Sequence, residues 1–151
     1  MNNKESMYVC FVQNEHKLPQ EIIAALMENE KGINVEEIKS KVQVFKNQEL
    51  EPDILDSVRG KEIILIATQA ENINIELVKV LLYVDALRRA GAEKISLWMP
   101  YFYYERQDKT GKKRTSISAR VFADEFQNLG VSHFVTVHLH NEAIEGFFKC
   151  P

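Results

Sequence analysis

Apolar positions along the chain follow two alternating patterns. Short runs rich in Val, Ile and Phe, each of strand length, recur between longer segments whose apolar residues repeat every three or four positions. Strands that alternate with helices in this way indicate βαβ units and a mainly parallel sheet. The predicted strands cover residues 7–12, 42–45, 62–68, 95–99 and 134–139, and the predicted helices begin at Pro19 and cover residues 74–90 and 117–129.

Two segments define the predicted layers. Residues 63–66 are continuously apolar, which is typical of a strand covered on both faces. The segment 74–90 has a wide apolar stripe, carries Arg88 and Arg89 in its last turn, and is followed by Gly91, as expected of a helix that ends there. We therefore predict a single α/β domain over residues 1–151, with three layers and a mainly parallel β-sheet flanked by helices.

Composition excludes several classes of protein. Hydrophobic residues make up 45% of the chain and charged residues 27%, which is ordinary globular composition. The net charge of −3 indicates neither a nucleic-acid nor a membrane partner, and no apolar run approaches the ~20 residues that span a bilayer. Cys10 and Cys150 form no metal-binding or disulfide pattern, and the polar N-terminus does not resemble a signal peptide. We expect a cytoplasmic protein with reduced thiols.

Candidate chemistry gathers in two loops that follow predicted strands, where parallel sheets bind ligands. The first loop carries five basic residues, Arg106, Lys109, Lys112, Lys113 and Arg114. Guanidinium and ammonium groups in such a loop suit phosphate recognition, although basic surface loops without a ligand are also common. The aromatic run 101–104 before them is equally compatible with core packing and with stacking on a base.

The second loop carries His138 and His140, which a continuous strand would place on the same face. This spacing admits a metal site and, as one hypothesis, a zinc hydrolase. Zinc needs three or four ligands, and the sequence has no HExxH or cysteine pair to complete them, so a histidine pair without a metal is favoured by pattern alone. No GxGxxG, P-loop or nucleophile elbow is present, and Ser116 and Ser118 have no catalytic partner in sequence.

Several motifs in order resemble the ribose-phosphate pyrophosphokinase (PRPP synthetase) family. They are FKNQE at 45–49, SVRGK at 57–61, DALRRA at 85–90, PYFYYERQD at 100–108, ISAR at 117–120, the histidine at 140 and IEGFF at 144–148. The resemblance implies a phosphoribosyltransferase-like fold. It also implies an enzyme that uses Mg²⁺ and transfers the diphosphoryl group of ATP to ribose 5-phosphate, which gives PRPP and AMP. Family members are homo-oligomers whose ATP site lies between subunits.

The resemblance also assigns roles to individual residues. Arg106 and Gln107 would contact ATP, and His140 would help to hold the Mg²⁺ ion, with a carboxylate supplied by a partner and ATP oxygens completing the coordination. Phe45, Asn47 and Glu49 would come from a neighbouring subunit and bind the adenine. Ser57, Arg59 and Arg114 match positions that line a regulatory phosphate or ADP site in some members.

The chain also departs from the family pattern. No stretch resembles the loops that bind ribose 5-phosphate, so we expect the C-terminal ribose-5-phosphate-binding domain to be absent and the chain to be inactive alone. His138 stands where the family has an aspartate, Gly111 where it often has one, and Ile75 where its long helix begins with an acidic residue. These departures leave open an alternative, a catalytically silent regulatory or scaffolding homologue that assembles with full-length subunits.

Overall fold

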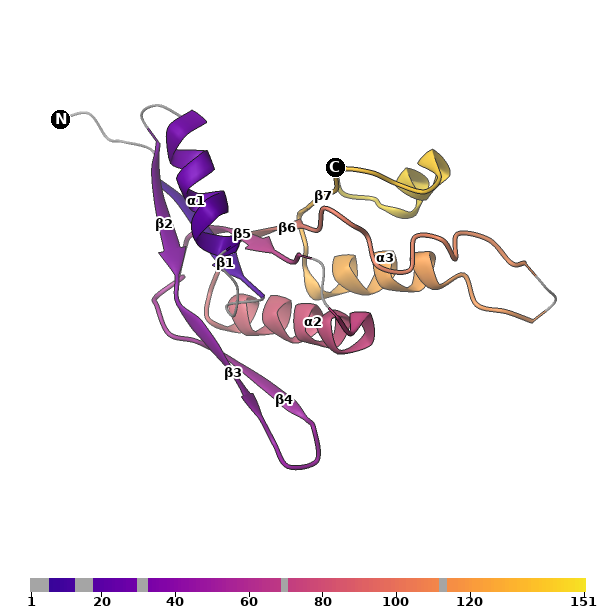
Figure 1. Cartoon of the computed structure of the whole chain (residues 1–151), viewed down its shortest axis with the longest axis horizontal. Coiled ribbons are helices and arrows are strands. Elements are labelled where there is room, and N and C mark those ends of the chain that lie inside the picture. Colours follow the sequence, from indigo (N-terminus) through magenta and orange to yellow (C-terminus); the bar gives the residue numbers. More distant parts are fainter. Residues whose placement is uncertain (1–5, 13–17, 30–32, 69–70, 112–113) are drawn as a thin grey trace.

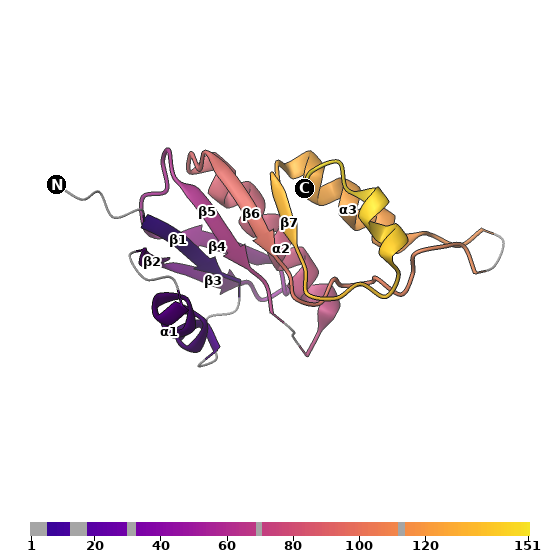
Figure 2. The ribbon, with the colours of Figure 1, turned by 90° about the horizontal axis from the view of Figure 1, so that it is seen from above.

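The computed structural model describes residues 6–12, 18–29, 33–68, 71–111 and 114–151. Its centre is a five-stranded sheet in the order β2-β1-β5-β6-β7, and each neighbouring pair runs parallel (Figures 1 and 2). The strands are β1 (Ser6–Phe11), β2 (Asn34–Ile38), β5 (Glu62–Ile66), β6 (Lys94–Trp98) and β7 (His133–Val135). The parallel order brings the carboxyl ends of all five strands to one edge of the sheet.

Helices cover both faces of this sheet. The helix α1 (Leu18–Asn29) lies on one face over β1 and β2, and α2 (Ile73–Arg89) and α3 (Ser118–Leu129) lie on the other (Figure 1). Successive side chains of β5 point to the two helix layers in turn. Ile63 and Leu65 belong to the main core under α2 and α3, while Ile64 and Ile66 belong to a smaller cluster under α1. The predicted three-layer α/β fold is therefore confirmed.

Helix boundaries follow the signals in the sequence. The side chain of Asn72 caps α2 by accepting hydrogen bonds from the backbone N–H groups of Asn74 at 3.1 Å and Ile75 at 3.3 Å. The glycine after α3, Gly130, has a φ of 104°, a left-handed conformation that closes the helix and that other residues adopt at a cost. The predicted ends of both helices lie within one residue of those observed.

The strand predicted at residues 42–45 is present, but it lies outside the five-stranded sheet. These residues belong mostly to β3 (Ser40–Val44), which pairs with β4 (Leu50–Ile54) in an antiparallel hairpin separate from the five-stranded sheet. The second strand of the sheet is β2, which the sequence analysis missed. Its buried residues Val35 and Ile38 are three positions apart, so the run shows no strand-like alternation.

The last predicted strand is also shorter than expected. The strand β7 ends at Val135, and beyond it only an isolated bridge joins Tyr101 to His138. The prediction that residues 134–139 form one strand is therefore wrong, and with it the argument that His138 and His140 must share a face of the sheet. A short 3-10 helix, η1 (Glu142–Phe147), follows and was not predicted.

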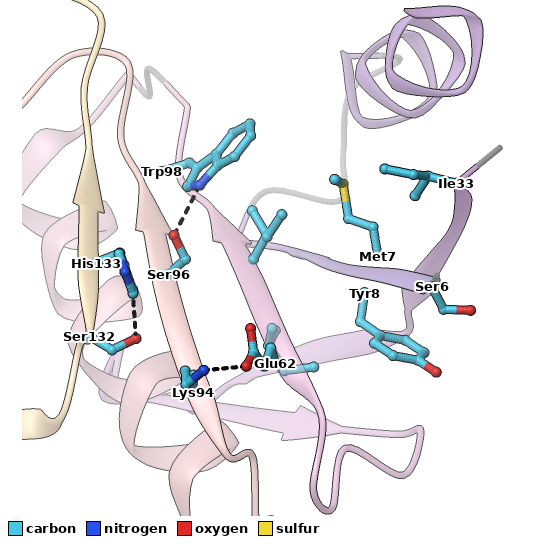
Figure 3. Close-up of a pocket in the computed structure, with 12 residues that line it drawn as sticks. Ser6, Met7, Tyr8, Ile33, Glu62, Lys94, Ser96, Trp98, Ser132 and His133 are labelled. Atoms are coloured by element: carbon cyan, nitrogen blue, oxygen red, sulfur yellow. Dashed lines mark hydrogen bonds and ion pairs between the residues drawn. The ribbon is translucent and has the colours of Figure 1, made fainter. Parts of the chain in front are cut away.

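One part of the sheet is left open on the face that carries α1. Figure 3 shows this groove of about 330 Å³, where Trp98 donates a hydrogen bond to Ser96 at 3.0 Å and Lys94 pairs with Glu62. None of the predicted site residues lines it. None of the helices in the described ranges combines the length and the apolar surface that crossing a bilayer requires.

Candidate functional site

The base of the first loop is built from buried aromatic side chains. Phe102 and Tyr103 are completely buried, and Phe102 packs edge-on against Phe134 and Phe148. The Tyr103 hydroxyl donates a hydrogen bond to the carbonyl of Thr68. Of the two interpretations of the aromatic run, core packing therefore holds for Phe102 and Tyr103, and this packing fixes where the basic part of the loop begins.

A sharp turn follows these aromatic residues. Tyr104 has a φ of 65°, a left-handed conformation that is strained for a residue with a Cβ and is often found near functional sites. Its ring packs against Phe122 at 5.1 Å between centroids, and its hydroxyl donates to the side chain of Asn74 on α2. Beyond the turn, Glu105 is buried and Arg106 is exposed to solvent.

Arg106 and Gln107 present polar groups in different ways. Arg106 forms no salt bridge with any residue that the structure describes. The side-chain oxygen of Gln107 accepts a hydrogen bond from Ser118 at 2.6 Å, and its carbonyl accepts one from the N–H of Ala119 at 3.2 Å. The amide NH₂ of Gln107 has no hydrogen-bond partner among the described residues, so it can donate to an anionic ligand.

The second loop docks directly against the first. The N–H of Val137 donates to the carbonyl of Pro100 at 3.3 Å, beside the bridge between Tyr101 and His138. Further along, two carboxylates of the first loop bind the second: Glu105 accepts the backbone N–H of His140 at 2.9 Å, and Asp108 accepts the side-chain amide of Asn141 at 2.7 Å. The structure thus brings the segment that carries Arg106 beside the segment that carries His140.

The protein side chains near His140 do not form a complete metal site. His138 and His140 are both exposed, and no three His, Cys, Asp or Glu side chains gather as ligands within the described ranges. The zinc hydrolase hypothesis therefore has no support from these residues. Mg²⁺ is usually bound by one or two carboxylates and by substrate phosphates. Within the described ranges, His140 has no such set of carboxylates around it, so these side chains alone do not form a magnesium site.

The residues predicted to bind adenine lie at the tip of the β3–β4 hairpin. The N–H of Phe45 donates to the carbonyl of Glu49 at 2.9 Å, and the side chain of Asn47 accepts the N–H of Glu49 at 3.3 Å. Phe45 and Glu49 line a pocket of about 670 Å³ between the hairpin and α2. In Figure 1 the tip of the hairpin points to the bottom and the orange loop extends to the right, so the two segments project in different directions from the domain.

The three residues of the expected regulatory site are also separated. Ser57 and Arg59 lie in the segment before β5, where the N–H of Gly60 donates to the carbonyl of Gly91 at 2.9 Å, close to the start of β6. Arg114 follows the carboxyl end of β6, at the opposite edge of the sheet. All three side chains are exposed. Because they lie at opposite edges of the sheet, a phosphate site that used them together would need more than one chain. Lys112 and Lys113 lie outside the described residues.

Comparison with known proteins identifies the fold and its loops. A family model described as the N-terminal domain of ribose phosphate pyrophosphokinase matches residues 7–130. The chain belongs to the ribose-phosphate pyrophosphokinase family. It is 39% identical over 113 residues to ribose-phosphate pyrophosphokinase 1 of Streptococcus pyogenes serotype M3, a match that covers 75% of this chain and 35% of that protein. It is 36% identical over 129 residues to the ribose-phosphate pyrophosphokinase of Cereibacter sphaeroides, which covers 85% and 38%.

A solved member of this family has the same fold. The crystal structure of phosphoribosylpyrophosphate synthetase from Mycobacterium smegmatis superposes with a TM-score of 0.84 and 30% sequence identity, over 98% of this chain and 47% of that one. The chain therefore spans about a third of the length of these two ribose-phosphate pyrophosphokinases and about half of the solved one.

Sequence reasoning missed the residues that hold these pyrophosphokinase loops together. No sequence motif assigns a role to Glu105 or Asn141, and the sequence gives Ser118 no catalytic partner. The one visible signal was a carboxylate, Glu105, between an aromatic run and Arg106. Its burial depends on how the two loops meet, and local sequence does not determine that.

Proposed function

We propose that this chain is the ATP-handling domain of a ribose-phosphate diphosphokinase. In this account it binds Mg-ATP, and it takes part in diphosphate transfer to ribose 5-phosphate, with PRPP and AMP as products, when an acceptor-binding half is supplied. Membership of the family and the docking of the Arg106 loop against the His140 loop support the proposal.

The decisive observation is that Arg106 is exposed while the residues around it are fixed. Glu105 and Asp108 bind the second loop and Gln107 binds Ser118, so the guanidinium extends from a fixed base, and no carboxylate in the described part of the chain forms a salt bridge with it. A pre-positioned cation of this kind suits a polyphosphate, because phosphoryl-type transfer depends on positioning and on stabilising negative charge.

Each residue of the site then has a chemical role. Arg106 donates to phosphate oxygens, and the amide NH₂ of Gln107 donates beside it. His140 would help to hold the nucleotide's Mg²⁺, which when bound neutralises phosphate charge, while Asp108 positions the second loop through Asn141. Phe45, Asn47 and Glu49 of a second subunit would bind the base, which makes the proposed enzyme a homo-oligomer.

Calorimetric titration with Mg-ATP tests the binding part of this proposal. We expect the wild-type chain to bind and Arg106→Ala to bind about tenfold to a hundredfold more weakly, because a charge-assisted hydrogen bond contributes roughly 1.5–3 kcal/mol. Arg89→Ala is the matched control, because Arg89 is exposed in the last turn of α2, pairs with Asp85 and lies at the opposite end of the sheet. Equal affinities for all three proteins would contradict the proposal.

A turnover assay tests the need for a second half. We expect the chain mixed with Mg-ATP and ribose 5-phosphate to release no AMP above background, since it spans only about a third of the pyrophosphokinases that it matches. Robust formation of AMP by the chain alone would show that no separate acceptor half is required.

The alternative is a catalytically silent homologue that regulates or supports full-length subunits. The exposed His138, beside a site where the described residues gather no metal-binding group, favours this possibility. It predicts no heat on titration with Mg-ATP, together with stable co-assembly with a full-length ribose-phosphate pyrophosphokinase in size-exclusion chromatography.

A further inference from the structure

We propose that Glu105 and Asp108 form a two-point clip that positions His140 relative to Arg106, and that this clip sets the Mg²⁺-dependent part of nucleotide affinity. The inference rests on the proposed function, since it concerns the same nucleotide site. It assigns to Glu105 a positioning role and not a role in contacting the nucleotide.

The burial of Glu105 is the first observation. Glu105 is 4% exposed. In the described ranges, the other buried polar or charged residues are Glu76 and Ser118. A buried carboxylate is destabilising unless it is paired or hydrogen-bonded. Glu76 meets that need with the ammonium of Lys79 at 2.7 Å, whereas Glu105 accepts the backbone N–H of His140.

The hydrogen bond from the His140 N–H to Glu105 holds a segment of main chain in place, whereas a buried ion pair joins two side chains. It fixes the main chain of the second loop at His140, the residue whose imidazole faces solvent. The carboxylate lies on the inner side of the first loop, and Arg106, the next residue, is exposed on the outer side. Fixing His140 through Glu105 thus fixes it with respect to the neighbouring guanidinium.

Asp108 supplies the second point of the clip. Its carboxylate accepts the side-chain NH₂ of Asn141 at 2.7 Å, while the side-chain oxygen of Asn141 accepts the N–H of Ala143 at 3.0 Å and begins η1. The same helix contains Ile144, which is completely buried. Asn141 is therefore held from the first loop on one side and by a core-anchored helix on the other.

The two contacts together bracket both functional side chains. Glu105 and Asp108 lie on either side of Arg106 and Gln107 in sequence, and they bind two consecutive residues of the second loop. Neither loop can then slide along the other without breaking a hydrogen bond to a carboxylate. Partners of the ring N–H of a metal-binding histidine orient that ligand, and their loss typically lowers metal affinity by about tenfold to a hundredfold. Glu105 would act in the same sense through the backbone N–H of His140.

The clip predicts a selective defect. Removal of the Glu105 carboxylate frees the main chain at His140 but leaves Arg106 able to bind phosphate. Affinity for Mg-ATP should therefore fall, while affinity for ATP in the presence of EDTA should change little. A purely structural role for Glu105 would lower both affinities together.

The experiment is calorimetric titration of wild type, Glu105→Ala and Glu105→Gln with Mg-ATP and with ATP plus EDTA. We expect Glu105→Ala to weaken Mg-ATP binding about tenfold or more and metal-free binding less than about twofold. Glu105→Gln keeps an oxygen that can accept the His140 N–H, so it should recover most of the Mg-ATP affinity. In a His140→Ala background, Glu105→Ala should have no further effect.

Two additional variants separate the possible outcomes. Glu76→Ala removes the other buried carboxylate and should lower the thermal midpoint without changing the ratio of the two affinities. Asn141→Ala opens the second point of the clip and should reproduce the selective loss, so the test stands even if Glu105→Ala fails to fold.

Equal loss with and without Mg²⁺, or a full effect of Glu105→Ala in the His140→Ala background, would overturn the inference. Absence of wild-type binding would instead contradict the proposed function.

Discussion

Individual side chains in the core have properties that can be tested without any ligand. Cys10 is completely buried in β1, and this burial raises the pKa of its thiol from 9.0 to about 12. Burial likewise raises the pKa of Tyr83 from 10.0 to about 12. The hydroxyl of Ser40, the first residue of the hairpin, lies 3.9 Å from the Cys10 sulfur and 3.0 Å from the Tyr83 oxygen. These three groups connect β1, α2 and the hairpin.

These pKa values predict how stability depends on pH. The unfolded chain releases the Cys10 and Tyr83 protons near their ordinary pKa values of 9.0 and 10.0, whereas the folded chain retains them up to about pH 12. The folded state therefore binds more protons between pH 9 and 12, and the free energy of unfolding should fall as pH rises through this range. Urea unfolding from pH 7 to pH 11 measures the decline. The double variant Cys10→Ala, Tyr83→Phe should show a shallower decline, and an equally steep one would contradict this explanation.

At the same scale, the sequence motifs point to exposed candidate residues but not to the residues that support them. Arg106, Gln107 and His140 occur in motifs that resemble the family, and the structure places their loops together. The bond from Ser118 to Gln107 spans eleven residues, and that from His140 to Glu105 spans thirty-five. Contacts of that kind arise from tertiary packing, which local sequence does not encode.

Elements with strong local signals were predicted closely, and those that depend on their neighbours were not. The helix α2 has both a capping residue, Asn72, and a glycine after its end, so its limits could be found from sequence. The strand β2 pairs only with β1 and has just two buried residues. The hairpin residues 42–45 alternate as a strand does, but alternation alone cannot say which sheet a strand joins.

The cap of α2 yields a prediction at this scale. Asn72→Ala removes the acceptor for the N–H groups of Asn74 and Ile75 and should lower the free energy of unfolding by about 1 kcal/mol. Asn72→Asp keeps an acceptor oxygen and places negative charge at the positive end of the helix, so it should be close to wild type. Urea denaturation at neutral pH compares the three proteins. Equal stability of Asn72→Ala and wild type would show that the cap contributes little.

Across the whole molecule, the residues of the proposed nucleotide site belong to two separate segments of the chain. Arg106 and His140 lie beyond the carboxyl ends of β6 and β7, and Phe45 lies at the tip of the hairpin (Figure 1). The α/β class could be predicted from the alternation of elements. The direction of the hairpin could not, because it depends on how β4 packs against α2. The proposed function assigns these two regions to different subunits.

This division predicts complementation between two defective chains. Phe45→Ala and Arg106→Ala should each bind Mg-ATP weakly when alone. A dimer that contains one of each has one site with both intact residues, so random mixing should restore about a quarter of the sites. Calorimetry on an equimolar mixture, after dissociation and reassembly, measures the recovered stoichiometry. No recovery in a mixture that forms mixed dimers would place Phe45 and Arg106 in separate sites.

The most direct test of the central claim, that Arg106 and His140 together bind the polyphosphate of ATP, is paramagnetic NMR with Mn²⁺ in place of Mg²⁺. On addition of Mn-ATP, we expect the backbone amide signals of residues 105–108 and 138–141 to broaden first, because both loops surround the metal-bound phosphates. The signals of Ser57 and Arg59, at the other edge of the sheet, should remain sharp at the same concentration. Mn²⁺ without ATP is the control. Broadening at the opposite edge, with both loops unaffected, would contradict the account.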